Sequence, residues 1–148
     1  MNRSSWITTG KCWKPQWKVT ISYLAAEHAG QTDKEGRKRI LSSLDMLDPN
    51  EICTETYLVV DACDTKEEAE HLHSYLKTRF VRFLIAQLAS TQHLSKEKFA
   101  FVPLQDFSSN TPIDWTKSVA EIDEQLFAYY GLTEPERAFI RSTIKEMS

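Results

Sequence analysis

The sequence is poor in the residues that mark disulfide-stapled, disordered or membrane-spanning chains. Its 148 residues include 3 cysteines, 4 glycines and 5 prolines. The odd cysteine count, with no Cys-x-x-Cys pair, favours reduced thiols over a disulfide framework. An apolar run such as residues 83–86 is far too short to cross a bilayer, and the N-terminus lacks the order of a signal peptide. We therefore expect a soluble, cytoplasmic protein with no membrane partner.

The composition is that of a folded chain with an uneven charge distribution. It is 41% hydrophobic and 26% charged, and its length fits one domain over residues 1–148. The net charge is -3, but Lys and Arg outnumber Asp and Glu within residues 1–50 and are outnumbered after that. Any surface that faces phosphates is therefore expected in the first two thirds of the chain.

Three segments have the pattern of β-strands. Residues 17–23 alternate apolar and polar side chains, which predicts a strand with one buried face. Residues 54–60 are rich in β-branched and aromatic types, which predicts a second strand. Residues 99–104 predict a third strand, which Pro103 would end or place at a sheet edge.

Helical patterns cover most of the rest. Thr65 and Glu68 form a capping-box sequence before apolar residues spaced by three and four, so we predict a helix of about six turns over residues 66–88. The spacing from Ile40 to Leu47 predicts a short helix that stops before Pro49.

The C-terminal third predicts two helices. One covers residues 119–130 and ends at Gly131, and the other begins at a second capping box, Thr133 to Glu136, with Phe139, Ile140 and Ile144 as its apolar residues. Together these patterns predict an α/β (α+β) fold: a small mixed or antiparallel sheet, one long helix packed on it, and a C-terminal helical pair.

Catalytic and metal-binding patterns are absent from the sequence. Its glycines never cluster into a phosphate loop. His71 and His73, two apart on a helix, point to different sides and are expected to be solvated rather than metal ligands. Asp61 and Asp64 faintly resemble part of a nuclease metal site, but Asp64 is already explained by the start of the helix. We expect no metal site and no catalytic residues here. The tail carboxylates are expected on exposed faces: Glu121, Asp123, Glu124, Glu134 and Glu136.

Six ordered stretches carry a resemblance to a known family. They are WKVTIS at residues 17–22, CTETYLVV at 53–60, DTKEEAE at 64–70, SYLKTRFVRFL at 74–84, FVPLQDF at 101–107 and YGLTEPERAFI at 130–140. In this order and spacing, nearly the whole chain resembles the C-terminal region of adenine-specific DNA methyltransferases of type II restriction–modification systems, some of which are called restriction endonucleases. The family carries Gly-Pro where this chain has Ala62 and Cys63. It is often shorter around residues 108–117, so that stretch resembles an insertion, and residues 24–50 match poorly.

The resemblance implies a non-catalytic role in DNA target recognition. In the family an upstream domain binds S-adenosylmethionine and holds a flipped adenine with an Asn/Asp-Pro-Pro-aromatic tetrapeptide. This sequence has no such tetrapeptide, so it would be either an excised domain or a remnant, with no cofactor of its own. The expected partners are double-stranded DNA and the upstream methyltransferase domain.

Candidate DNA contacts fall into three groups. Flexible basic side chains in the polar loop, and others on the long helix opposite its core residues Phe80 and Phe83, could neutralise phosphates. Polar residues on or after strands could read base edges, although turn and capping roles explain them nearly as well. The loop group is Lys34, Arg37, Lys38 and Arg39, the helix group is Lys77, Arg79 and Arg82, and the polar group is Thr54, Thr56 and Gln105.

Two other functions stay open at this point. The domain could be an intramolecular scaffold that orders its catalytic partner without touching DNA, and exposed apolar area without a basic face would favour this role. An autonomous nuclease is the other alternative, and it predicts magnesium-dependent cleavage of DNA.

Overall fold

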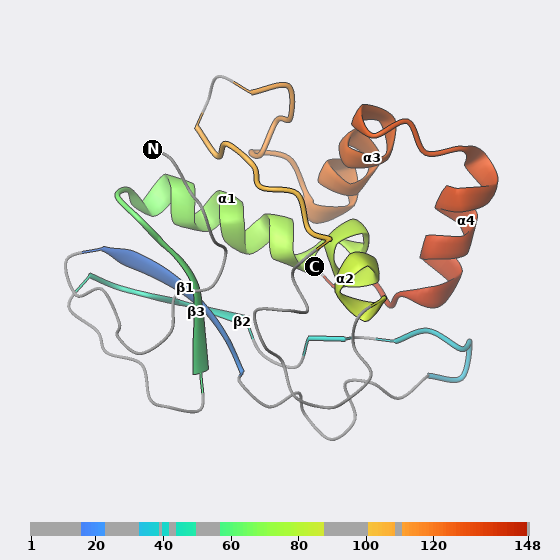
Figure 1. The fold of residues 1–148 in the computed structure, drawn as a ribbon, viewed down its shortest axis with the longest axis horizontal. Coiled ribbons are helices and arrows are strands. Elements are labelled where there is room, and N and C mark those ends of the chain that lie inside the picture. Colours follow the sequence, from blue (N-terminus) through green and yellow to red (C-terminus); the bar gives the residue numbers. More distant parts are fainter. Residues whose placement is uncertain are drawn as a thin grey trace.

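The computed structural model describes residues 16–22, 33–38, 40–41, 44–49, 57–87, 101–108 and 111–147. Figure 1 shows the sheet on one side of the molecule with a helix lying across it, and the remaining helices gathered on the other side. The elements, in chain order, are β1 (Trp17–Ser22), β2 (Leu44–Leu47), β3 (Tyr57–Cys63), α1 (Lys66–Lys77), α2 (Arg79–Ala86), α3 (Val119–Tyr129) and α4 (Glu134–Thr143).

The sheet is antiparallel, which is one of the two arrangements predicted. Its order is β2-β1-β3, so β1 is central. Ile21 lies opposite Leu44 on β2, and Trp17 lies opposite Cys63 on β3. The register with β3 shifts between Val19 and Thr20. The second predicted strand is confirmed over its described part but continues to Cys63, and residues 54–56 lie outside the described residues.

The central strand is buried on both faces, so the prediction of one buried face is wrong. Val19 and Ile21 are fully buried, but Lys18 and Thr20 are also buried, with 0% and 2% of their surface exposed. The Lys18 Nζ donates to the carbonyls of Gln16 at 2.9 Å and Asp48 at 3.1 Å. A long amphipathic side chain can therefore occupy this position because its ammonium reaches backbone oxygens.

The helix predicted between Ile40 and Leu47 does not form. Leu44–Leu47 is strand β2, which pairs with β1, while Ile40 and Leu41 are buried in irregular chain. Ile40 has a φ of 72°, which interrupts any regular element. Pairing with a neighbouring strand has outweighed the local helical spacing, as tertiary contacts commonly do.

The long predicted helix is two helices that meet at Thr78. Thr65 caps α1 as predicted, since its hydroxyl accepts from the Glu68 amide at 3.1 Å. At Thr78 the backbone turns to φ -64° and ψ 151°, an extended conformation that ends α1 and begins α2. The uninterrupted apolar spacing through this region therefore hides a break in the backbone.

The third strand, predicted over residues 99–104, is absent from residues 101–104, which are irregular, and residues 99–100 lie outside the described residues. This segment packs on α1 instead of pairing: the Tyr75 hydroxyl donates to the Pro103 carbonyl at 2.9 Å, and Val102 is buried. Burial raises the pKa of the Tyr75 phenol, which stays neutral and able to donate.

The C-terminal helical pair is confirmed, together with the residues predicted to bound it. Gly131, at φ 67°, follows α3, and the amides of Gly131 and Leu132 donate to the carbonyls of Ala128 and Phe127, a Schellman motif. Thr133 and Glu136 form the predicted capping box at the start of α4. Both helices contribute to one cluster of buried residues that also includes α1 and the sheet. No helix in the described part of the chain is long and apolar enough to cross a membrane.

Candidate functional site

A buried polar junction joins α1, α2 and α3. Thr78 and Arg82 are fully buried and Asp123 is 6% exposed, although all three are polar or charged. The Thr78 hydroxyl donates to the Tyr75 carbonyl at 2.6 Å and accepts from the Val81 amide at 3.2 Å. One side chain thus bonds the last turn of α1 and the first turn of α2, which stabilises the break between them.

Arg82 bonds two backbone carbonyls at the junction of α1 and α2. Its Nε donates to the Lys77 carbonyl at 3.0 Å and the Thr78 carbonyl at 3.2 Å. Carbonyls in a last helical turn lack partners within the helix, and a cation there is favoured by the helix dipole. The prediction that Arg82 lies on an exposed, DNA-facing side of the helix is therefore wrong.

Asp123 reaches from α3 to cap α2. Its two carboxylate oxygens accept from the amides of Arg79 at 2.8 Å and Phe80 at 2.9 Å. Burial raises the pKa of the Asp123 carboxyl, and the two amide bonds and nearby arginines oppose that shift. The expectation that Asp123 is solvated is wrong, because the first amides of α2 need an acceptor where water is excluded.

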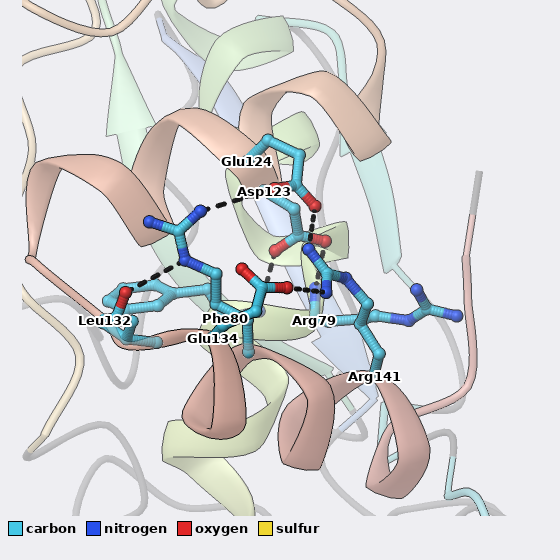
Figure 2. A network of polar contacts seen from close by, with 8 residues as sticks. Arg79, Phe80, Asp123, Glu124, Leu132, Glu134 and Arg141 are labelled. Atoms are coloured by element: carbon cyan, nitrogen blue, oxygen red, sulfur yellow. Dashed lines mark hydrogen bonds and ion pairs between the residues drawn. The ribbon is translucent and has the colours of Figure 1, made fainter.

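A second polar network ties α3 to α4 (Figure 2). Glu124 forms ion pairs with Arg141 and, at 4.0 Å, with Arg137. Arg137 also donates to the Leu132 carbonyl at 3.0 Å, and Arg141 reaches Glu134 at 3.4 Å. Both arginines of α4 are therefore bonded to groups on α3, on α4 or in the turn between these helices. A small cavity of about 40 Å³ lies beside these groups, lined by Arg79, Arg82, Asp123 and Arg141 among others.

The loop group of predicted DNA contacts is only partly free to meet a phosphate. Lys34 is exposed at the turn tip. Arg37 pairs with Asp33 at 3.3 Å and Glu35 at 3.2 Å, which neutralises its charge locally. The pKa of the Asp33 carboxyl is lowered, chiefly by the Arg37 backbone amide. Arg39 lies outside the described residues.

Of the helix and polar groups, Arg79 and Gln105 are hydrogen-bonded within the protein. Arg79 is half-buried and its Nε donates to the Ile144 carbonyl at 3.0 Å. Lys77 is half-buried in the last turn of α1. Gln105 donates to the hydroxyls of Tyr130 at 2.7 Å and Tyr75 at 3.4 Å, so its side-chain amide is used within the protein. Thr54 and Thr56 lie outside the described residues.

Two of the predicted cations meet at the C-terminal segment. Lys38 pairs with Ile144 as a parallel bridge. The Lys38 amide donates to the Thr143 carbonyl, and the Lys145 amide donates to the Lys38 carbonyl, each at 2.7 Å. Arg79 bonds the same Ile144, so Lys38, Arg79 and the exposed Lys145 lie around one backbone segment. Glu146 is exposed beside them and reduces the net charge of this group.

The two histidines point to different places, as their spacing predicts, but neither is simply solvated. His71 is buried, with Nδ1 2.8 Å from the Phe107 carbonyl, and His73 Nε2 lies 3.1 Å from the Leu44 carbonyl. Burial lowers the pKa of His73, which favours the neutral ring. Within the described ranges, no group of three or more His, Cys, Asp or Glu residues could hold a metal ion.

An apolar groove runs between α2 and α4. It has a volume of about 420 Å³ and is lined by Phe80, Phe83, Leu84, Leu132, Pro135, Glu136, Phe139 and Ile140. Phe139 is 59% exposed and meets the Phe83 ring edge-on, with 5.8 Å between ring centroids. Tyr130 stacks on Phe80 with centroids 5.1 Å apart, and Tyr129 is exposed next to it. We call this site the α2–α4 groove.

The sequence did not reveal this groove. The helical pattern places Phe139 and Ile140 on one apolar side of the last helix, whereas the structure buries Ile140 and exposes Phe139. Adjacent helical residues point about 100° apart, so they rarely share one buried face. This angle is the feature of the sequence that argues against burying both Phe139 and Ile140. Phe80 is core as predicted, but Phe83 is only partly buried.

No known protein family, curated protein or solved structure matches this sequence. The chemistry of the site therefore rests on its own geometry. The buried charges of Arg82 and Asp123 join helices to one another, and the α2–α4 groove is an open, mainly apolar surface.

Proposed function

We propose that this chain is a non-catalytic docking domain of a restriction–modification enzyme, which packs on an adenine-specific DNA methyltransferase domain in the cytoplasm. The observation that carries the docking role is the α2–α4 groove with Phe139 exposed at its rim, while Arg37, Arg82 and Arg141 are paired or buried. An apolar groove whose lining includes one charged residue, Glu136, suits contact with protein rather than phosphate. The identity of the partner comes from the sequence resemblance alone.

The test is reconstitution with the methyltransferase domain encoded in the same or the neighbouring gene. The full chain should co-elute with that domain in size-exclusion chromatography and raise its transfer of tritiated methyl groups to DNA. Phe139→Ser should weaken the complex at least tenfold. Phe101→Ser is the matched control, since Phe101 is similarly exposed, at 55%, but does not line the groove. Equal binding by the two variants would remove the groove from the interface.

Recognition of double-stranded DNA is the second candidate function. It is favoured by the meeting of Lys38, Arg79 and Lys145 around Ile144, with Lys34 exposed in the same loop as Lys38. Charge reversal of Lys34 and Lys38 should flatten the dependence of log affinity on log salt for a duplex, measured by fluorescence anisotropy. Charge reversal of Arg37 should change that slope less, because its charge is already paired. An unchanged slope in the lysine variant would reject this surface.

A further inference from the structure

We infer that the α2–α4 groove receives an amphipathic α-helix of the partner protein whose apolar side is flanked by Lys or Arg. This inference rests on the proposed docking function and names the chemistry of the element that docks. Its basis is the shape of the groove, the exposure of its rim and the sign of its charge.

The shape suits a helix because the groove is itself bounded by two packed helices. α2 contributes Phe83 and Leu84, and α4 contributes Pro135 and Phe139. Two helices that pack together leave an elongated furrow, and a third helix can place its i, i+3, i+4 and i+7 side chains there.

Phe139, at the exposed rim of the groove, is the side chain that a partner helix would cover. Phe139 keeps 59% of its surface exposed, although Phe83 contacts its ring edge-on. Aromatic side chains in a desolvated pocket typically contribute most of the energy of a protein interface. Leu132 and Ile140 form apolar walls beside it, so an incoming aliphatic side chain would be enclosed by carbon on several sides.

The charge of the groove selects a basic partner. Among the described residues that line it, Glu136 alone is charged. Its carboxylate accepts from the Thr133 amide at 2.8 Å, and this bond lowers the pKa of Glu136, which stays ionised. The α4 arginines offer no compensation, because Arg137 and Arg141 pair with Glu124 on α3. A helix with Lys or Arg beside its apolar stripe is therefore complementary, and one with Glu is repelled.

The test uses the full chain and three 18-residue probe peptides, with binding measured by fluorescence anisotropy. One peptide is an amphipathic Leu/Lys helix, the second has the same composition in scrambled order, and the third replaces each Lys with Glu. The Leu/Lys helix should bind the wild type and Phe101→Ser alike. Binding should fall at least tenfold for Phe139→Ser, for the scrambled peptide and for the Leu/Glu peptide.

Several results would overturn the inference. Equal binding to the scrambled peptide would show attraction to the net charge of the chain, and equal binding to the Leu/Glu peptide would remove the charge selection. Sedimentation of the chain alone as a dimer that Phe139→Ser dissociates would make a second copy the occupant. If the peptide binds through Phe139 but the methyltransferase domain does not bind, the groove chemistry stands and the proposed partner is wrong.

Discussion

Removing the carboxylate of Asp123 should destabilise the protein by about 3 kcal/mol. Asp123 gives both oxygens to the first amides of α2, at 2.8 Å from Arg79 N and 2.9 Å from Phe80 N. The Phe80 amide is buried and the Arg79 amide is partly buried. Because each such donor without an acceptor costs about 1–3 kcal/mol, the two together give about 2–6 kcal/mol, and we expect alanine to cost about 3 kcal/mol, in the lower half of that range.

The burial of Asp123 limits how large the predicted loss of stability can be. Its raised pKa shows that water exclusion penalises the ionised carboxyl more than the amide bonds favour it. The loss should therefore stay below the upper end of the range. Asp123→Asn keeps one acceptor but turns an N–H₂ group toward the other amide, so it should cost about half as much as alanine.

The assay is urea unfolding followed by tryptophan fluorescence, with Trp115 as a buried reporter. Glu121→Gln, on the same helix but exposed, is the control and should change the unfolding free energy by about 0.5 kcal/mol or less. A loss below about 1 kcal/mol for Asp123→Ala would refute the reasoning, because the two amides would then have found other acceptors.

The pH dependence of Asp123 gives an independent test of its burial. Since its pKa is raised in the folded state, the folded protein holds this proton more tightly than the unfolded chain does. Its contribution to stability is full below the ordinary value of 3.8 and is lost as pH rises through the raised value. The stability difference between wild type and Asp123→Asn should therefore shrink from acid toward neutral pH, and a growing difference would contradict the sign.

Three further outcomes can be checked by thermal or acid unfolding. Thr133→Ala should lower stability by about 1 kcal/mol, because it removes the capping box of α4, and an unchanged Tm would argue against that box. Gly131→Ala should cost about 1 kcal/mol, since its φ is 67°, and no loss would mean that α3 ends differently. The pKa values of Asp33, Asp114 and Glu136 are lowered in the folded protein, so their contribution to stability should be present above their ordinary pKa values and lost as pH falls through the lowered pKa values. Replacing each carboxylate in turn with its amide should make the unfolding free energy less sensitive to acid, and an unaltered acid profile would count against these hydrogen bonds.

Sequence reasoning succeeded where the signal is local. The N-cap at Thr65, the capping box at Thr133 and the glycine after α3 are each set by residues within one turn of a helix end. Such motifs satisfy backbone groups next to themselves, so distant parts of the chain have little influence on them. The C-terminal helical pair was predicted for this reason.

Sequence reasoning failed where a distant residue decides the outcome. The apolar spacing continues without interruption through Thr78, but Asp123, far along the chain on α3, supplies an acceptor that lets a new helix begin there. The sequence favours an exposed face for Arg82 because a charged residue rarely lies in a core, yet the break brings the Lys77 and Thr78 carbonyls within reach of its Nε. Strand β2 likewise depends on its pairing with β1.

The candidate site was predicted only in part. The resemblance pointed to basic side chains, of which Lys34 is exposed and Arg37 is paired with carboxylates. The α2–α4 groove depends on how α4 packs against the other helices, with Ile140 buried and Glu124 of α3 paired with Arg137 and Arg141. Such contacts join residues of different helices and cannot be seen in one helical segment alone. The angle between adjacent helical residues shows that Phe139 and Ile140 do not share one buried face, but it does not say which of the two is buried.

Hydrogen–deuterium exchange of the chain with and without the methyltransferase domain tests the docking role most directly. We predict that added protection falls on residues 79–87 and 132–140, which form the two walls of the α2–α4 groove. Protection confined to residues 33–38 and 144–147, and appearing only when duplex DNA is added, would contradict the docking role and would assign the function to the basic segment instead.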